Sequence, residues 1–425
     1  MEKYQKYRGT YSNQAMTKIS TSIFLLFFWV WSCKPSEPKL IELEIIPFPK
    51  LENAAMPSLF ASDSNLYISW VTMGNDTTSE LYYSNLDSQE QWTTPQLINR
   101  GSNWFVNWAD FPALVENQGV LLSHILQKSS PETFSYDVKL QVLPKGASQW
   151  SLNLPLHQDS TLTEHGFVSM VPYTATSFFT SWLDGRETGG GGHDHAAHAG
   201  GPMSIRAAEV DLNGKVLWDE LLDAKTCDCC QTSSAITDLG PVVVYRNRSD
   251  REIRDIAITR LLDGKWTEPA IIHPDGWEIS GCPVNGPKVV AKGSNLLIGW
   301  FTAPKGIQQV KFAFSTDAGA SFGIPVVIES TGLIGRVDVA LLNEDWGVVS
   351  WMETKGDQTF LYAAGIDQTG EMGAALQISV VDPSRKSGFP QLEVLAGQVY
   401  FAWTEVVGEV KNVRTARIPQ EAFLF

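Results

Sequence analysis

The feature that most constrains this sequence is a repeat of short apolar runs that end at an aromatic or histidine residue. The first is Leu66–Trp70 (LYISW) and the third is Phe178–Trp182 (FFTSW). Seven such runs recur at intervals of 51 to 63 residues, and they end at Trp70, His124, Trp182, Tyr245, Trp300, Trp351 and Trp403. Recurrence at a near-constant period indicates a repeat architecture in which each unit packs on its neighbours.

Each unit has room for four short strands. A proline-marked turn such as Pro57 opens the first strand, and a third strand such as Val310–Phe314 follows the apolar run. An aromatic residue then precedes a proline-marked fourth strand, as at Trp266. Four strands per unit are typical of a β-propeller blade. We therefore predict an all-β fold, a single β-propeller of seven four-stranded blades over residues 40–425, or of six if the irregular second unit is not a blade.

The ring is expected to close through the N-terminal part of the chain. The last unit supplies only three strands, which end near Pro419, and an unassigned apolar stretch occurs at Leu40–Ile46. That stretch would complete the seventh blade and remove its open edge, as ring closure requires.

The first 33 residues predict a secreted, lipid-anchored protein. The apolar run Ile23–Trp31 is too short to span a bilayer comfortably. We interpret residues 1–32 as a signal peptide, with Met16 as an alternative start. The end of this run, Val30-Trp-Ser-Cys33, resembles a bacterial lipobox. The resemblance implies a lipidated Cys33, a tether over residues 33–39, and a place in the bacterial cell envelope. Lys34 favours the outer membrane.

The charge balance bears on possible partners. The chain has 32 Lys and Arg against 47 Asp and Glu, a formal net charge of −15. So acidic a chain is a poor ligand for nucleic acids or anionic membrane surfaces. We expect no nucleic-acid partner, and membrane contact through the lipid anchor only.

One turn carries a family signature. Residues 315–322 (STDAGASF) match the Asp-box, S-x-D-x-G-x-[ST]-[FW], through Ser315, Asp317, Gly319 and Phe322. The aspartate can accept bonds from turn amides, and the glycine permits positive φ. The chain therefore resembles sialidases and other Asp-box (BNR) propellers. The resemblance implies that these residues are structural, because the Asp-box of sialidases lies away from the active site.

Sialidase-type catalysis has further requirements. The resemblance implies an arginine triad, an acid/base Asp and a Tyr–Glu nucleophile pair on six blades. This chain departs from that pattern in its seven units and in lacking an arginine motif that opens the first one. Glycoside hydrolysis also needs two carboxyl groups that flank the scissile bond. Candidates near strand ends are Asp110, Asp338, Glu353 and Glu405.

Unusual residues gather on the loops of one predicted face. The cysteines of the propeller body are Cys227, Cys229, Cys230 and Cys282, and a nearby loop holds His193, His195 and His198. As thiolates, with the histidines, they offer ligands for Cu(I) or Zn(II). As disulfides they would link the connections into blades four and five. The sequence leaves both interpretations open, and copper or zinc are the only cofactors that it suggests.

Arginines lie on or near the same face: Arg246, Arg248, Arg254 and Arg336, the last close to Asp338. Guanidinium groups suit carboxylate, sulfate or phosphate ligands, although they also pair with neighbouring acids. Our first hypothesis is an extracytoplasmic propeller that binds an anionic glycan, another acidic ligand or a protein partner on this face. The alternatives are a glycoside hydrolase of the exo-sialidase type and a copper- or zinc-binding envelope protein.

Overall fold

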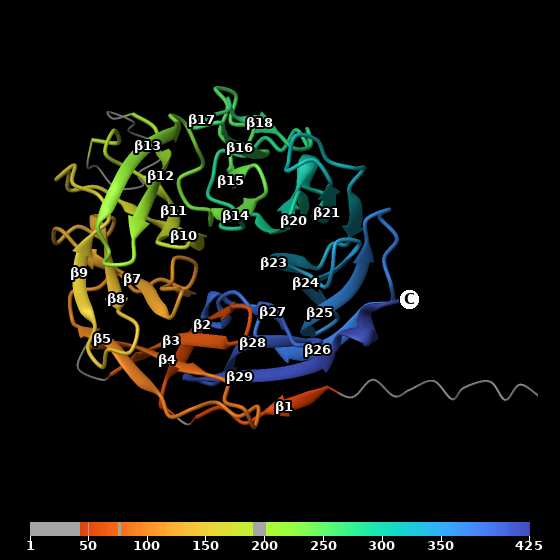
Figure 1. The fold of residues 1–425 in the computed structure, drawn as a ribbon. Coiled ribbons are helices and arrows are strands. Elements are labelled where there is room, and N and C mark those ends of the chain that lie inside the picture. Colours follow the sequence, from red (N-terminus) through yellow and green to blue (C-terminus); the bar gives the residue numbers. More distant parts are fainter. Residues whose placement is uncertain (1–42, 50, 75–77, 190–200) are drawn as a thin grey trace, which may run out of the picture. The chain divides into compact units, whose positions relative to one another are not determined.

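The structure is a computed structural model that describes residues 43–425, except 50, 75–77 and 190–200. The part from residue 41 onward forms one compact unit. Seven antiparallel sheets are arranged in a ring (Figure 1), which confirms the seven-bladed propeller over the six-bladed alternative. The predicted signal peptide, Cys33 and its tether lie outside the described residues, and so do His193, His195 and His198.

In the first six blades the strands run outward from the ring centre in chain order, and in the seventh the N-terminal β1 takes the outermost place (Figure 1). The first three blades are β2–β5 (Ala54–Ala61, Leu66–Met73, Ser79–Asn85, Gln96–Gly101), β6–β9 (Leu114–Asn117, Val120–Lys128, Tyr136–Leu143, Ser151–Pro155) and β10–β13 (His165–Thr174, Ser177–Asp184, Ser204–Asp211, Val216–Asp223). The fourth is β14–β18 (Ser233–Thr237, Gly240–Arg246, Ile256–Leu262, Lys265–Trp266, Ala270–Ile271). Its outermost position is shared by β17 and β18, which both pair with β16.

Blades five to seven complete the ring. They are β19–β22 (Lys288–Lys292, Asn295–Thr302, Gln309–Ser315, Val326–Glu329), β23–β26 (Leu333–Leu341, Trp346–Lys355, Gln358–Asp367, Leu376–Val381) and β27–β29 with β1 (Gln391–Leu395, Gln398–Val407, Val410–Pro419, Glu44–Ile46). The described residues contain no α-helix, only the 3-10 turns Pro304–Gly306, Arg385–Ser387 and Gln420–Phe423. Nowhere in the described ranges is there a helix of the length and hydrophobicity needed to cross a membrane.

The repeated apolar runs are the second strands of the blades. All seven residues that end these runs, from Trp70 to Trp403, are buried. Strands packed on both faces read as continuous apolar runs, and the blades place each second strand between two neighbours. The outer strand β9 is mostly exposed and β13 has a single buried residue, so their sequences carry a weaker pattern.

The N-terminal strand closes the ring. β1 pairs antiparallel with β29, with Glu44 opposite Arg417. The buried hydroxyl of Thr415 donates to the carbonyl of Ile46 and accepts from Trp92 Nε1, both at 2.9 Å. The first and last strands of the propeller are thereby held together, which confirms the predicted closure.

The Asp-box is the turn between β21 and β22. Asp317 accepts bonds from the backbone N–H and the hydroxyl of Ser321, at 2.9 and 2.6 Å. Gly319 has φ +79° and donates to Ser315 Oγ at 2.9 Å. The Phe322 ring packs on a core cluster shared by blades four and five. The turn thus ties two blades together.

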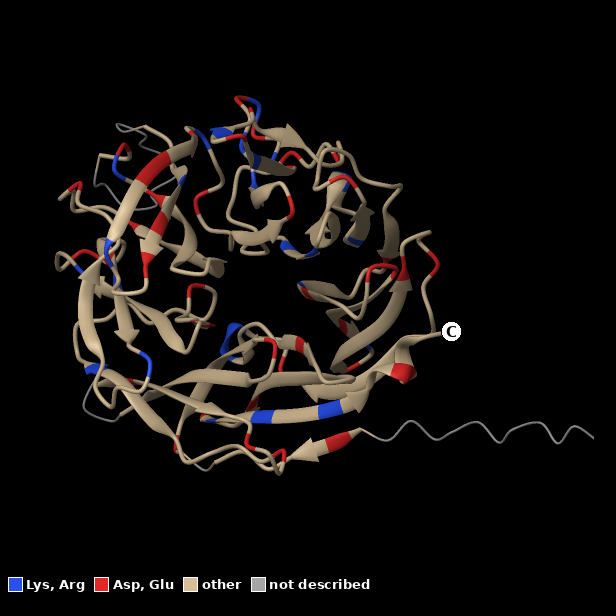
Figure 2. Ribbon diagram, in the orientation of Figure 1, with Lys and Arg blue, Asp and Glu red and all other residues tan. Residues whose placement is uncertain are grey.

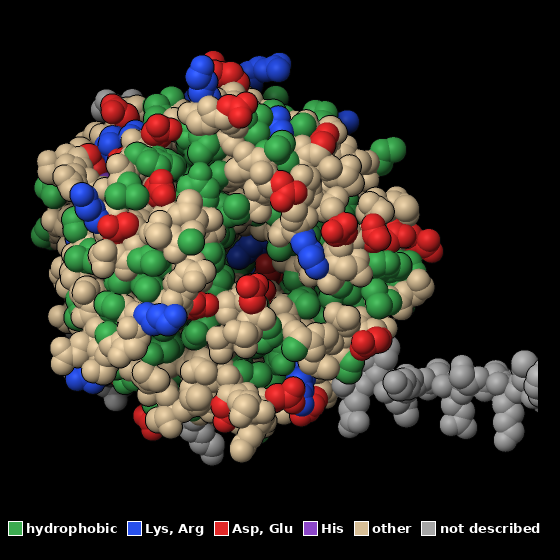
Figure 3. All heavy atoms as spheres, in the orientation of Figure 1, with side chains coloured by type: hydrophobic (Ala, Val, Ile, Leu, Met, Phe, Trp, Pro, Cys, Tyr) green, Lys and Arg blue, Asp and Glu red, His purple; other side chains and the backbone are tan. Residues whose placement is uncertain are grey.

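Charged residues of both signs are scattered around the ring (Figure 2). Figure 3 shows the viewed face hollowed at its centre, with basic and acidic side chains both visible there. The charge on this view is therefore mixed rather than a patch of one sign.

Candidate metal centre

Three cysteines share the turn that connects blade three with blade four. The backbone N–H of Cys227 donates to the carbonyl of Arg246 at 2.9 Å. Just after the turn, Gln231 Nε2 donates to the carbonyl of Ala109 at 2.7 Å. These bonds attach both ends of the turn to other elements, and they fix the backbone of the three cysteines.

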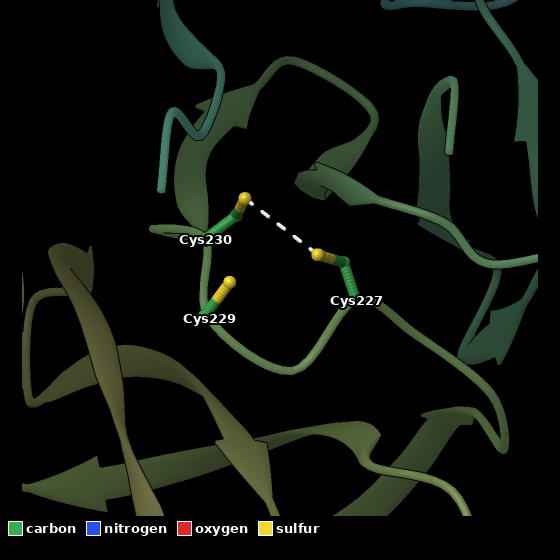
Figure 4. Close-up of side chains that lie close together, drawn as sticks. All are labelled: Cys227, Cys229 and Cys230. Carbon is green, nitrogen blue, oxygen red and sulfur yellow. Dashed lines mark hydrogen bonds between the residues drawn. The ribbon is translucent and has the colours of Figure 1, made fainter. Parts of the chain in front are cut away.

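The sulfur atoms of Cys227, Cys229 and Cys230 face a common space (Figure 4). All three Sγ atoms lie within 4.8 Å of one another, and Cys227 Sγ is 3.7 Å from Cys230 Sγ. The residues are 1%, 7% and 2% exposed, respectively. None of the three forms a disulfide in the structure. The turn therefore presents three buried soft donors at close range.

Cys282 joins this group from a different connection, the one between blades four and five. It is partly exposed, and its thiol contacts Cys229. Like the other three, it forms no disulfide in the structure. The predicted gathering of the four body cysteines is thus present in the structure, with Cys282 on the outer side.

Arginine borders the cluster. Arg254 Nη1 donates to Cys227 Sγ at 3.2 Å. Contacts with the thiols of Cys229 and Cys230, together with the charges of Arg254 and Arg246, hold the pKa of Cys227 well below that of an ordinary thiol. The same contacts raise the pKa of Cys229, and burial raises that of Cys230 to about 12. Of these three thiols, Cys227 is therefore the one that loses its proton most readily.

The surroundings of the cluster are apolar. The three turn cysteines belong to a core cluster that includes Met203, Phe167, Tyr245 and Phe389. Such a shell restricts solvent access and lowers the local dielectric around a site. It also places a second kind of soft sulfur, the thioether of Met203, in the same cluster.

Two of the arginine candidates bind backbone carbonyls. Arg246 donates from Nη2 to the carbonyls of Asn285 and Phe301, each at 2.7 Å. Arg336 donates to the carbonyl of Gly388 at 2.8 Å and stacks over the Trp108 ring at 4.9 Å. Both side chains are buried, and these contacts join adjacent loops.

The other two bind acids beside the cysteine turn. Arg248 pairs with Glu252 at 2.9 Å and with Asp228 at 3.1 Å. Arg254 pairs with the same Glu252 at 2.8 Å. The structure therefore brings Arg246, Arg248 and Arg254 together around the turn. There the guanidinium groups are already bound to other groups of the protein. Arg336 lies apart, between blades six and seven.

Two carboxylate candidates link blades at the inner strands. Asp338 Oδ2 accepts from the backbone N–H of Leu392, and Asp110 Oδ1 accepts from that of Phe167, at 2.9 and 2.7 Å. Burial raises the pKa of both aspartates. Each bond runs to the following blade, so these side chains join neighbours in the ring.

The remaining carboxylates lie elsewhere. Glu353 is buried beside Trp351 Nε1 at 3.5 Å, with Lys355 3.4 Å away. Glu405 pairs with Arg414 at 2.8 Å near the surface. Their partners are on their own strand or the adjacent one in the same blade.

Sequence reasoning missed a tyrosine–glutamate contact in blade two. Tyr136 Oη donates to Glu164 Oε1 at 2.5 Å, and both residues are buried. Burial and the charges of Glu164 and Asp110 raise the pKa of Tyr136. A sialidase-type nucleophile pair would have to reach substrate, and this tyrosine is fully inside the protein. No spacing in the sequence marks the pair.

It also missed a histidine network between blades two and three. The rings of His157 and His165 stack at 3.9 Å, and Asp159 Oδ2 lies 2.7 Å from His157 Nδ1 and 3.2 Å from His165 Nε2. Arg186 pairs with Asp184 at 2.7 Å and approaches Asp159 at 3.5 Å. Arg186 supplies the positive charge beside these carboxylates, so we interpret the group as a salt-bridge network. The short H-x-D spacing at 157–159 was its only sequence signal.

Comparisons with known proteins find similarity in structure and no match in sequence. No protein-family model matches the sequence, and no curated protein matches it. A protein of unknown function from Dyadobacter fermentans is similar in structure, with a TM-score of 0.51 and 12% identity over 89% of this chain and 98% of that one.

Weaker similarities involve two enzymes. The phage phi92 endosialidase gives a TM-score of 0.46 at 10% identity, over 89% of this chain and 69% of its own. The polysaccharide lyase Uly1 gives a TM-score of 0.47 at 9% identity, and the match covers 88% of this chain and 91% of the lyase. Identities this low show a shared fold alone, and function has to be argued from the site.

Proposed function

We propose that this chain binds one thiophilic metal ion, Cu(I) or Zn(II), through Cys227, Cys229 and Cys230. The observation that carries the proposal is the convergence of three buried sulfur atoms from one turn, within 4.8 Å of one another. Zinc–sulfur bonds are about 2.3 Å long, so two sulfurs on a tetrahedral ion are about 3.8 Å apart. The Cys227–Cys230 separation of 3.7 Å fits that geometry.

The electrostatics support the same proposal. Metal-bound thiolates carry negative charge, and an isolated buried charge is costly. Arg254 donates directly to Cys227 Sγ, and the charge of Arg246 acts on the same sulfur. These two buried cations offset the charge of the thiolates. Soft sulfur ligands in an apolar shell select Cu(I) or Zn(II) over Mg²⁺ or Ca²⁺.

We further propose that the propeller acts outside the cytoplasm, tethered to the bacterial envelope through a lipid on Cys33. This rests on the apolar run and lipobox-like end of residues 23–33. A thiol cluster in an oxidising compartment needs protection from disulfide formation, and a bound metal ion provides it.

The anionic-ligand hypothesis has less support. The guanidinium groups of Arg246 and Arg336 bind carbonyls, and those of Arg248 and Arg254 bind Glu252. An acidic glycan, another acidic ligand or a protein partner on this face would have to displace those bonds. The metal centre requires no such rearrangement.

The test is metal content with thiol count on the full chain, purified in detergent without chelators or a histidine tag. We expect about one copper or zinc ion per chain and four reduced thiols after denaturation. Cys227→Ser and Cys230→Ser should each abolish stoichiometric binding. The matched control, Cys33→Ser, makes the same change outside the cluster and should retain the metal. Metal-free protein with a Cys227–Cys230 disulfide would refute the proposal.

A further inference from the structure

The four cysteines differ in their access to solvent. Cys227 and Cys230 are almost wholly inside the protein, Cys229 is 7% exposed, and Cys282 is partly exposed. Cys282 contacts Cys229. The thiols therefore form a series that begins at the surface with Cys282 and ends at Cys227.

The inner side of the series is closed. Arg254 lies against Cys227 and is 1% exposed. Arg246 lies near the same sulfur and is fixed by three carbonyls, those of Arg254, Asn285 and Phe301. An ion that approached from this side would have to displace a buried guanidinium group. The partly exposed Cys282 offers a more accessible side for approach.

The loop with Cys282 is packed directly on the cysteine turn. The backbone N–H of Gly286 donates to Gln231 Oε1 at 2.9 Å. A Cβ atom at Gly286 would lie 2.1 Å from the carbonyl oxygen of Gln231, so glycine is needed for this approach. Between Cys282 and Gly286, Val284 has φ +48°, which a β-branched residue rarely adopts.

From this arrangement we infer that Cys282 is the exchange ligand through which the metal ion enters and leaves the three-cysteine cluster. The inference rests on the proposed function. In the release step, the ion moves to bind Cys282 and an incoming thiol, its bonds to the inner cysteines break, and the Cys282 bond breaks last. Cys282 and the incoming thiol each lose a proton on binding the ion, and two inner cysteines take up these protons as their own bonds to it break. Cys282 regains a proton from solvent when its bond to the ion breaks. The oxidation state of the metal does not change.

The experiment measures rates and affinity separately on the metal-loaded full chain. Release is followed by stopped-flow with bathocuproine disulfonate for Cu(I) or pyridylazoresorcinol for Zn(II), and loading with the glutathione complex of Cu(I) or with Zn(II) alone. We expect Cys282→Ser to keep about one ion per chain and to slow both loading and release at least tenfold, while its affinity changes less than either rate. Ser280→Ala, an exposed change in the same loop, should match the unmodified chain.

A second measurement does not require a variant. Peptide mapping after brief iodoacetamide treatment of the loaded protein should find Cys282 alkylated first while the ion stays on the inner cysteines, and this alkylation should slow release as Cys282→Ser does. Unchanged or faster release from Cys282→Ser, or from the protein alkylated at Cys282, would overturn the inference and leave the proposed function intact. Absence of metal from the unmodified chain would instead be a failure of the proposed function.

Discussion

Arg254 Nη1 lies 3.2 Å from Cys227 Sγ, and both residues are 1% exposed. A guanidinium group buried against a sulfur atom stabilises the thiolate form of that sulfur. Arg254 also pairs with Glu252, which fixes its orientation. This contact separates the cysteine turn from an ordinary group of core thiols, which would be neutral and would have no cation beside them.

Replacing Arg254 should therefore weaken metal binding. A hydrogen bond to a charged group is worth about 1.5–3 kcal/mol, so Arg254→Gln should raise the metal dissociation constant by roughly 10- to 100-fold. Competition titration against a chelator of known affinity measures the change. Arg414→Gln removes a guanidinium group from an exposed pair with Glu405 and should leave the affinity unaltered. Equal affinities for the two variants would contradict the role given to Arg254.

The histidine network should make stability depend on pH. Burial lowers the pKa of His165, but the bond to Asp159 and the charge of Asp184 outweigh it and raise the pKa above its ordinary value. The stabilising effect is then complete below about pH 6.5 and is lost as pH rises through the folded-state pKa. The pKa of Asp159 is lowered by its bonds with His165 and Thr161, despite burial. Its contribution is present above about pH 3.9 and is lost as pH falls through the folded-state pKa.

Asp159→Asn should accordingly lower the free energy of unfolding more at pH 5.5 than at pH 8.5. Denaturant titration at the two pH values checks this. Asp367→Asn changes a carboxylate in an exposed turn whose partners are amides and a hydroxyl, and it should give similar losses at both. A pH-independent loss for Asp159→Asn would mean that His165 is neutral in the folded protein.

Ring closure should depend on one hydroxyl. Thr415→Val preserves the shape of the side chain but leaves Trp92 Nε1 and the carbonyl of Ile46 without their bonds. Unsatisfied buried polar groups cost about 1–3 kcal/mol each, so we expect at least about 1 kcal/mol less stability. Thermal or chemical unfolding tests the value. Thr369→Val, in an exposed turn, should cost much less.

The anchor should depend on Cys33. If Cys33 carries the lipid, Cys33→Ser should transfer most of the protein from the membrane fraction to the soluble fraction, because the variant cannot be lipidated at that position. Fractionation of expressing cells tests this. Cys282→Ser should remain in the membrane fraction. A membrane-bound Cys33→Ser variant would point to an uncleaved apolar segment.

The fold could be predicted because its signal repeats. The runs that end at Trp70, Trp300 and Trp403 are apolar on both faces since each is enclosed by neighbouring blades, and seven copies reinforce one another. The orphan strand at Glu44–Ile46 could be assigned because the last unit lacked one. The outer strands, exposed on one side, were harder to place, as β17 and β18 illustrate.

The site was predictable only in part. Cys227 and Cys282 could be assigned to one face because both lie in connections between successive blades, which share a face in a propeller. The partners of Arg246 and Arg336 are mostly backbone carbonyls, and a carbonyl has no sequence signature. The Tyr136–Glu164 contact joins β8 of blade two to a residue 28 positions later in the connection into blade three, and no motif spans that interval.

The pairing of β1 with β29 also has a consequence for the order of events during synthesis. Glu44 bonds with Arg417, 373 positions later, so the first strand of the propeller leaves the ribosome long before its partner exists. Until then β1 is an unpaired edge, and blade seven cannot form. Contacts of such long sequence separation form slowly, so a chain truncated before β29 would remain an open, aggregation-prone arc instead of a smaller ring.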